Sequence, residues 1–299
     1  MSSYNVPWIE KYRPQELEDV VFADAKNLTI FKDMVSSKQV PHLLFSGSAG
    51  TGKTTTAKIL AKSITQDVLY INASDENDVN TIRNKVKEFC SVIGWEDIRV
   101  VLLDECDHMS QSAQAALRNI MEEYIKYARF ILTANFPNKI LDALISRCQH
   151  FEFTGAPKKA ILKRLVFILK TEGVKVKSMD QLVAYVNGHG SDIRGLIGNI
   201  QKNVVNGELQ DFSSLMTDIS KYIELVQAQN FSAFSNEFMT DNIDPAEMLR
   251  MIFNEADKIN EEHKTEIRLA CGEGLRWHAN VVDPQINMFT SVLEIMTLF

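Results

Sequence analysis

Five short apolar runs, separated by segments with helical spacing, form the pattern of the first half of the chain. The runs cover residues 42–46, 68–72, 99–103, 129–133 and 150–153. Continuous apolar runs of this length are typical of strands that are buried on both faces of a sheet. Between them, apolar residues recur at helical spacing in segments 54–65, 78–93, 112–124 and 139–145. This alternation predicts an α/β fold in which helices cover both faces of a five-stranded parallel sheet.

The pattern changes after Pro157, where we expect the strands to end. Three segments with helical spacing follow, at 158–171, 180–187 and 192–204, and the chain is helical in pattern from Asp211 onward. Asp244 and Pro245 form a helix-start signal for residues 246–259. We therefore expect three domains: an α/β domain at 1–154, a small helical domain at 155–206 and a helical C-terminal domain at 207–299.

The composition is that of a globular protein. The chain has 299 residues, of which 45% are hydrophobic and 24% charged, so it can bury a large core, and this excludes disorder. Its apolar runs are far shorter than the roughly 20 residues that span a bilayer, and residues 1–4 do not resemble a signal peptide. We therefore expect an intracellular protein without a membrane partner. The four cysteines lack CxxC spacing, which argues against a zinc site or a disulfide framework.

Charge is distributed unevenly along the chain. The net charge of −7 would speak against a nucleic-acid binder if it were spread uniformly. Residues 207–299, however, hold 6 basic and 16 acidic side chains, and residues 1–206 hold 26 basic and 23 acidic ones. A surface that binds DNA phosphates is therefore expected in the first two thirds, with the acidic final third facing solvent or protein.

A glycine-rich segment follows the first predicted strand and opens the first predicted helix. Residues 47–54 read GSAGTGKT, which is the GxxxxGK[ST] pattern of a phosphate-binding loop in its required context. Glycines let successive backbone N–H groups face one concavity, and the helix N-terminus adds positive potential. Lys53 would neutralise the terminal phosphates, and the Thr54 hydroxyl would be a ligand of Mg²⁺. The predicted nucleotide contacts are Gly47, Ser48, Ala49, Gly50, Thr51, Gly52, Lys53, Thr54 and Thr55.

Two adjacent carboxylates end the third predicted strand. Asp104 and Glu105 follow four apolar residues and fall at the edge of the sheet where open α/β folds bind ligands. Asp104 would hold Mg²⁺ directly or through water, and Glu105 would polarise the water that attacks the γ-phosphate. Asn135 ends the fourth strand, where it would either orient that water or form a turn. Arg147 and Arg194 are, taken alone, also consistent with surface salt bridges.

Together these motifs resemble the small subunits of sliding-clamp loaders, in the replication factor C and T4-type phage branch of the AAA+ ATPases. The resemblance runs from Pro7 to about Gln201, and the collar assignment beyond Gly207 depends on position and helical pattern alone. Its most specific parts are EKYRP at 10–14 and SRC at 146–148. Its other landmarks are NASD at 72–75, IRN at 82–84, DECD at 104–107, AQAALR at 113–118, TAN at 133–135 and DIR at 192–194.

The resemblance implies an AAA+ nucleotide-binding domain with a helical lid and an all-α collar, which would bind ATP and Mg²⁺. Tyr12, Arg13 and Pro14 would form the adenine pocket, with Val20 and Val21 as apolar walls. The phosphate loop departs from the family at Ser48 and Ala49, where cellular members often have two prolines.

The resemblance also assigns residues that respond to the γ-phosphate or to other subunits. Asn135 is similar to the sensor 1 residue, and Arg194 to the sensor 2 arginine of the lid. Arg147 is similar to the arginine finger, whose cationic fork would act in trans on the ATP of a neighbouring subunit. Gln114 and Arg118 match positions that couple subunits, although four-residue spacing also fits an exposed polar pair on a helix.

The implied partners are primer–template DNA, a sliding clamp and other loader subunits: several copies of this chain and a different subunit in a ring, located with the replication machinery. Arg83 and Lys87 would contact DNA phosphates, or would belong to a solvated helix face. Val92, Ile93 and Trp95 would either plug a pocket on the clamp or pack in the core.

The final third carries an apolar stripe that would join collar domains or form the domain's own core. Its members are Leu269, Trp277, Phe289, Leu293 and Met296. Two other functions stay open: another AAA+ machine of DNA metabolism, such as a branch-migration motor or helicase loader, and a non-hydrolysing subunit of a loader ring. The SRC and EKYRP motifs argue against the first, and the complete set of catalytic positions argues against the second.

Overall fold

The computed structural model describes residues 6–75, 79–92, 98–188, 192–210, 219–241, 243–278 and 281–299. Two compact units make up the chain, residues 1–211 and 212–299. Within the described ranges, no helix combines the length and the apolar character that crossing a membrane requires.

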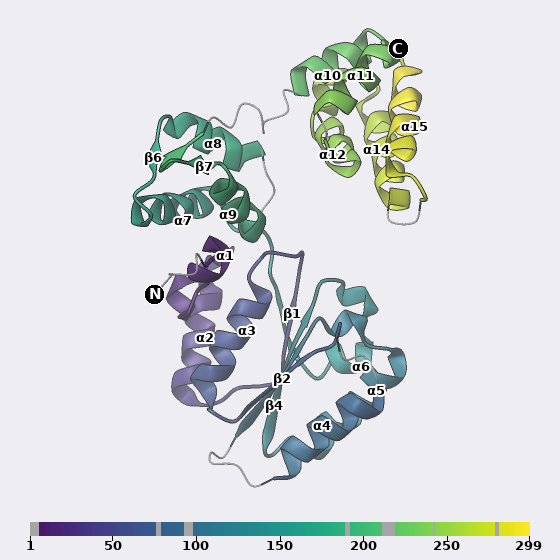
Figure 1. The fold of residues 1–299 in the computed structure, drawn as a ribbon. Coiled ribbons are helices and arrows are strands. Elements are labelled where there is room, and N and C mark those ends of the chain that lie inside the picture. The colour runs from purple at the N-terminus through teal and green to yellow at the C-terminus, as the bar shows by residue number, and fades with distance from the viewer. Residues whose placement is uncertain are drawn as a thin grey trace. The chain divides into compact units, whose positions relative to one another are not determined.

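A five-stranded parallel sheet forms the centre of the first unit (Figure 1). Its strands are β1 (Leu43–Ser46), β2 (Val68–Asn72), β3 (Arg99–Asp104), β4 (Ala128–Ala134) and β5 (Gln149–Glu152). They lie in the order β2-β3-β4-β1-β5, and every neighbouring pair is parallel. The predicted α/β fold is confirmed, and each strand boundary lies within one residue of its prediction.

Successive side chains of the inner strands β1, β3 and β4 pack into two separate cores, as expected for a sheet covered on both faces. Leu43, Phe45 and Ile131 pack with α2 (Ala25–Ser37) and α3 (Lys53–Ile64). Leu44 and Leu132 pack on the opposite face with α4 (Val79–Ser91), α5 (Gln111–Glu123) and the short α6 (Asp142–Ile145). The sheet is therefore the middle layer of three, and the carboxyl ends of its strands lie at one edge.

The lid contains the three predicted helices, α7 (Lys158–Thr171), α8 (Met179–Gly188) and α9 (Ile193–Lys202). The prediction that strands end after Pro157 is wrong. Short strands β6 (Lys175–Val176), β7 (Val204–Val205) and β8 (Glu208–Leu209) form a second sheet in the order β6-β8-β7.

A two-residue turn explains this second sheet. Asn206 and Gly207 join β7 to β8 with φ values of 52° and 77°, and a type I′ hairpin requires positive φ at both positions. The Asn-Gly pair at 206–207 is therefore the sequence feature that could have predicted this hairpin. The boundary predicted at 206 falls inside this hairpin, whereas the first compact unit extends to 211.

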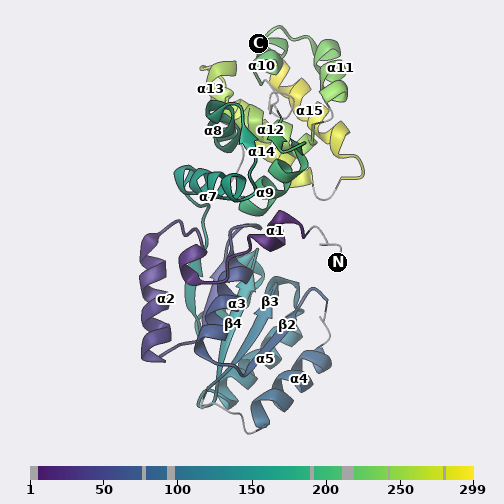
Figure 2. The ribbon, with the colours of Figure 1, turned by 60° about the vertical axis from the view of Figure 1, so that its left-hand side comes forward.

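The N-terminal segment joins the lid to the sheet domain. It contains α1 (Trp8–Lys11) and a 3₁₀ turn, η1 (Leu17–Asp19). Trp8 is buried, and its backbone N–H donates to Gln201 Oε1 on α9 at 2.8 Å. The Tyr12 hydroxyl donates to Glu172 Oε1, just past α7, at 2.6 Å. In Figure 2 this segment lies between the lid helices and α3, so it can contact a ligand bound between them.

The described residues of the second unit are helical, as predicted, and pack around one apolar core. Its helices are α10 (Ile219–Gln227), α11 (Phe231–Asp241), α12 (Pro245–Asn254), α13 (Ala256–Ile259), α14 (Lys264–His278) and α15 (Pro284–Met296). The single helix expected at 246–259 is interrupted at Glu255, whose φ and ψ of −102° and 14° leave the helical range.

The apolar stripe of the second unit has two different environments. Phe289 and Met296 belong to the core of the unit. Leu269, Trp277 and Leu293 are instead exposed by 66%, 55% and 45%. The core interpretation therefore holds for Phe289 and Met296, and a role in joining collar domains stays a prediction for the three exposed residues.

Candidate nucleotide-binding site

The phosphate loop connects β1 to α3 through a backbone that needs glycine. Gly47, Gly50 and Gly52 have φ values of 140°, 74° and 96°. A Cβ on Gly47 would lie 2.2 Å from the carbonyl oxygen of Phe153, which leaves no room for a side chain. The loop thus keeps the open concavity that the sequence predicted.

Lys53 begins α3 and lies at the centre of the loop. Its Nζ donates to the carbonyl oxygens of Gly47 and Ser48 and to Asn135 Oδ1, each at 2.8 Å. Burial lowers the pKa of the ammonium, and the nearby Asp104 carboxylate opposes that shift. The contact with Asn135 joins two predicted site residues from different elements.

Asp104 ends β3 as a buried carboxylate with three hydroxyl donors. Its Oδ1 accepts from Thr54 Oγ1 at 2.8 Å and from Thr133 Oγ1 at 2.5 Å. Its Oδ2 accepts from the Tyr70 hydroxyl at 3.0 Å. The predicted Mg²⁺ ligands Thr54 and Asp104 are therefore in direct contact. Tyr70 is a further partner of Asp104 that was not predicted.

This donor set suits Mg²⁺. The ion prefers oxygen ligands, keeps several waters and is commonly held by one or two carboxylates together with phosphates. A hydroxyl and a carboxylate beside a phosphate loop fit that description. Across the described residues there is no cluster of three His, Cys, Asp or Glu side chains that could hold a metal without phosphates.

Glu105 follows Asp104 in a left-handed backbone conformation, with φ of 57°. Its N–H donates to Thr133 Oγ1 at 3.0 Å, and the residue lines the same cavity as Lys53 and Asn135. The turn sends the chain away from β3 directly after the Asp104 position. Two adjacent carboxylates can therefore serve different parts of one site.

Asp107 is a site residue whose individual role we did not predict. Its buried carboxylate accepts from the backbone N–H groups of Asn135 at 3.1 Å and of Phe136 at 3.3 Å. These bonds fix the backbone after β4 and thus place the Asn135 amide beside Lys53. The sequence feature that could have pointed to Asp107 is its position as a third acidic residue, three residues after the end of β3.

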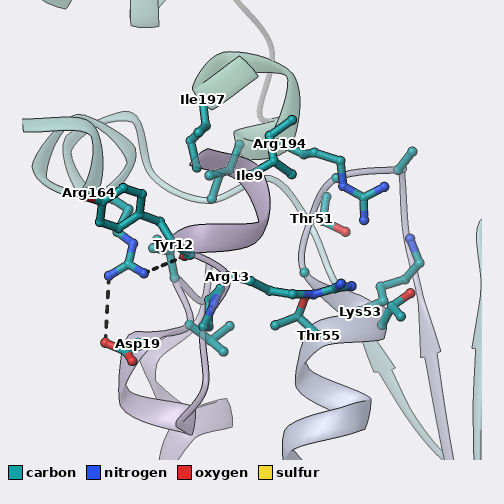
Figure 3. Close-up of a pocket in the computed structure, with 18 of the residues that line it drawn as sticks. Ile9, Tyr12, Arg13, Asp19, Thr51, Lys53, Thr55, Arg164, Arg194 and Ile197 are labelled. Atoms are coloured by element: carbon teal, nitrogen blue, oxygen red, sulfur yellow. Dashed lines mark hydrogen bonds and ion pairs between the residues drawn. The ribbon is translucent and has the colours of Figure 1, made fainter. Parts of the chain in front are cut away.

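The predicted adenine contacts line the same cavity as the phosphate loop. Tyr12, Arg13, Pro14, Val20 and Val21 are all among its walls. The Arg13 side chain extends toward Thr55 in Figure 3.

Two lid arginines also belong to this cavity, and only one was predicted. Arg194 reaches from α9 toward Thr51 and Lys53 (Figure 3). Arg164 was not anticipated. It donates to the Tyr12 carbonyl oxygen at 2.9 Å and lies 3.8 Å from Asp19 Oδ1, so it ties α7 to the N-terminal segment.

Arg147 does not line this cavity. Its Nε donates to Glu122 Oε1 of α5 at 2.9 Å, its Nη2 binds the same oxygen, and its Nη1 donates to the Ala143 carbonyl oxygen at 2.6 Å. One third of the side chain remains exposed. The arginine is thus held at the surface, away from the phosphate loop of its own chain.

Gln114 differs from the predicted subunit contact. Its side chain is buried, with Nε2 donating to the carbonyl oxygens of Met109 and Lys139 and Oε1 accepting from the N–H of Leu141. The alternative of an exposed polar residue is therefore wrong for Gln114, because its polar groups are bonded within the chain; its part in coupling subunits stays a prediction. Arg118 is half-buried and contacts the neighbouring Asn119 side chain at 2.9 Å.

The bond to Leu141 also explains a shortened helix. The predicted helix 139–145 is reduced to α6, preceded by a 3₁₀ turn, η3 (Pro137–Lys139). Ile140 and Leu141 are extended, with ψ values of 134° and 135°. Gln114 binds the carbonyl oxygen of Lys139 and the N–H of Leu141, so these two groups are not used in a continuous helix.

The predicted DNA contacts have different surroundings. Arg83 is exposed on α4, and no hydrogen bond or ion pair joins it to another described residue. Lys87 is directed to α5, with Nζ 3.1 Å from Glu123 Oε2. Arg83 is therefore the better candidate for a phosphate contact.

The predicted clamp contacts are only partly described. Ile93 and Trp95 lie outside the described residues. Val92 is 62% exposed, which excludes core packing for it. Ile125 and Tyr127 follow the adjacent helix α5 and are also exposed.

Sequence comparison relates the chain to replication proteins. The AAA family, described as the ATPase family associated with various cellular activities, matches residues 43–156. The replication factor C small subunit of Archaeoglobus fulgidus is 42% identical over 208 residues, covering 67% of this chain and 65% of that protein. Replication factor C subunit 3 of Saccharomyces cerevisiae is 37% identical over 209 residues, covering 67% and 60%. The chain thus matches less than two thirds of the length of these curated relatives, and about half of others, such as replication factor C small subunit 1 of Pyrobaculum islandicum, at 54%.

Comparison with solved structures agrees in fold. A variant of RuvB from Thermotoga maritima superposes with a TM-score of 0.56 at 13% identity, covering 92% of this chain and 90% of that one. At this identity the likeness concerns the fold alone. The AAA+ fold and the family resemblance predicted from the motifs are both confirmed: this chain is built on an AAA domain and is a relative of the replication factor C small subunits.

Proposed function

We propose that this chain is an ATPase subunit of a sliding-clamp loader. It would use ATP binding and hydrolysis to open a ring-shaped polymerase processivity clamp and load it onto primer–template DNA. One observation carries the proposal: a single cavity gathers the phosphate loop, Glu105, Asn135 and Arg194, while Arg147 lies outside it. A site that lacks one arginine fits a subunit that completes its chemistry in an assembly.

Ground-state binding would come from the loop and the N-terminal segment. Val20, Val21 and Tyr12 would enclose the adenine, and the N–H groups of the loop would bind the phosphates. Thr54 and Asp104 would hold Mg²⁺, which would neutralise developing charge on the β- and γ-phosphates. Arg194 would bring the lid onto the γ-phosphate.

Hydrolysis would depend on residues that act on the attacking water or on charge that develops later. Glu105 would accept the proton of the water, which Asn135 would orient. Asp107 would keep that amide in place through the backbone of Asn135. Arg147 of a neighbouring subunit would stabilise the charge of the transition state, after exchanging Glu122 for phosphate oxygens.

The proposed partners follow from exposed residues of the first unit. Arg83 would contact the DNA backbone without regard to sequence, and several copies in a ring would add such contacts. Val92, together with Ile125 and Tyr127 just after α5, would meet the clamp. The acidic second unit would join subunits in a collar away from DNA, and the protein would act inside the cell with the replication machinery.

Mixing two inactive variants tests the proposal. Lys53→Ala removes the phosphate contact of a subunit's own site, and Arg147→Ala removes only what it would supply to a neighbour. We expect each variant alone to lose ATPase activity, by about 10³-fold or more for the arginine. A mixture should recover part of the DNA- and clamp-stimulated rate, because some interfaces pair an intact pocket with an intact Arg147.

The same assay identifies the stimulating partners. ATPase rates would be measured for the chain alone and after stepwise addition of primer–template DNA, clamp and a candidate partner subunit. Assembly would be checked by sedimentation. An assembled mixture with no recovery would make Arg147 a structural ion-pair residue, and a rate insensitive to DNA and clamp would exclude a loader.

A further inference from the structure

Tyr70 is a polar-tipped side chain on the edge strand β2, and it contacts the proposed magnesium site. Its hydroxyl is the donor to Asp104 Oδ2, at 3.0 Å. The other carboxylate oxygen already accepts from Thr54 and Thr133. Among the described residues, Tyr70 is thus the side chain that fixes the second oxygen.

The sheet register brings these groups to one face. Residues 70 and 102 are partners across β2 and β3, as are residues 72 and 104. Ile71 packs in the core on the α4 side, whereas Leu102 packs on the α3 side. Tyr70 and Asp104 therefore both face α3, because side chains alternate along a strand.

Helix α3 contacts both Tyr70 and Asp104 from the same side of the sheet. Thr54 and Lys58 are four residues apart and so lie on one helix face. Thr54 donates to Asp104, and Lys58 Nζ lies 4.1 Å from the centroid of the Tyr70 ring. A cation at that distance is attracted to the ring and restricts its position. The phenol is thereby fixed in the orientation that reaches Asp104.

We propose that Tyr70 is a positioning residue for magnesium binding, which orients the Asp104 carboxylate so that Oδ1 stays directed at the Thr54 hydroxyl. The inference rests on the proposed ATPase function of this site. Partners of metal ligands commonly orient the ligand and tune the metal. Without the phenol, the carboxylate can rotate about its side-chain bond and lose its alignment with Thr54.

Tyr70→Phe tests this role because it removes the hydroxyl and keeps the ring under Lys58. Affinity for a slowly hydrolysed ATP analogue would be measured calorimetrically in EDTA and in Mg²⁺. The ratio of the two dissociation constants reports the contribution of magnesium without any turnover. We expect that ratio to fall about tenfold, the lower end for lost partners of metal ligands, with affinity in EDTA and the melting temperature unchanged.

Two further variants bracket the result. Asp104→Asn removes the proposed ligand itself and should abolish the effect of Mg²⁺ on nucleotide affinity. Tyr222→Phe is the matched control, because it also removes a tyrosine–aspartate bond, to Asp241 Oδ2 at 2.8 Å, but in the second compact unit. It should leave both dissociation constants at their original values.

The outcomes separate the two proposals. Tyr70→Phe could keep the original ratio of dissociation constants in EDTA and Mg²⁺ while Asp104→Asn shows no effect of Mg²⁺ on affinity. That result would overturn the role of Tyr70 and leave the proposed function standing. Equal losses of affinity in EDTA and Mg²⁺, with a lower melting temperature, would make Tyr70 a structural residue only. If the unaltered chain bound the nucleotide with no effect of Mg²⁺, the ATPase proposal would fail, and the Tyr70 proposal with it.

Discussion

Gln114→Ala should destabilise the first compact unit strongly, although a glutamine on an amphipathic helix would ordinarily be replaceable. Gln114 is 1% exposed, and its side chain makes three hydrogen bonds. One binds the carbonyl oxygen of Met109, just before α5, and the other two join α5 to Lys139 at the end of η3 and to Leu141 just before α6. Truncation leaves the N–H of Leu141 and two carbonyl oxygens without that partner. The segment that leads to Arg147 would lose its anchor.

The magnitude follows from these bonds. Each contributes about 1 kcal/mol net, and a buried donor left unpaired costs about 1–3 kcal/mol. Two lost bonds to carbonyl oxygens and one unpaired N–H therefore give an expected loss of about 3 to 5 kcal/mol in the free energy of unfolding. Such a loss is a large fraction of the ~5–15 kcal/mol that stabilises a typical protein.

Urea unfolding followed by circular dichroism would measure this loss. Gln111→Ala is the control, because Gln111 is an exposed glutamine in the first turn of the same helix. It should change stability by less than about 0.5 kcal/mol. A loss below about 1 kcal/mol for Gln114→Ala would show that water or neighbouring groups replace the three bonds, and the argument for an anchored α6 would be wrong.

Three further predictions concern catalysis, DNA and pH. Lys53→Ala should abolish tight ATP binding, whereas Glu105→Gln should bind ATP and lose single-turnover hydrolysis, because in the proposed mechanism Glu105 acts only on the water. Wild-type turnover by Glu105→Gln would refute that assignment. Arg83→Ala should leave basal ATP binding intact and lower the salt slope of DNA-stimulated activity by about one unit per contact; an unchanged slope would make Arg83 a solvated residue. Burial lowers the pKa of His42 from 6.5 to about 4, so the unfolded chain binds the proton more readily between these values. The contribution of neutral His42 to the free energy of unfolding should be fully present above pH 6.5 and should fall by about 3 kcal/mol as the pH approaches 4. Urea unfolding at a series of pH values should show a weaker pH dependence for His42→Gln.

The sheet could be predicted closely because its strands are buried on both faces and leave continuous apolar runs. The phosphate loop, Asp104, Glu105 and Asn135 were also predictable, because the carboxyl ends of parallel strands meet at one edge. The β7–β8 hairpin was missed because strands of two residues, such as Val204–Val205, give too little periodicity.

Partners that depend on register or on distant helices could not be predicted. Whether Tyr70 reaches Asp104 depends on which residues of β2 and β3 are neighbours, and an apolar run does not fix that pairing. Gln114 has helical spacing with Arg118, which fits either a subunit contact or an exposed polar pair and does not indicate burial. Its burial depends on where residues 139–141 pass over α5, which is a tertiary property.

The left-handed backbone conformation of Glu105 lowers stability at a residue that is proposed to be needed for hydrolysis. A left-handed conformation costs a residue with a Cβ about 1 kcal/mol relative to glycine, and Glu105 has φ of 57°. Random mutagenesis followed by selection for heat resistance alone should therefore favour glycine here, and with it a thermally robust protein that binds ATP without hydrolysing it. Under the proposed mechanism, engineering this chain for heat resistance must keep Glu105, because glycine would suit the backbone there but would lack the carboxylate proposed for hydrolysis.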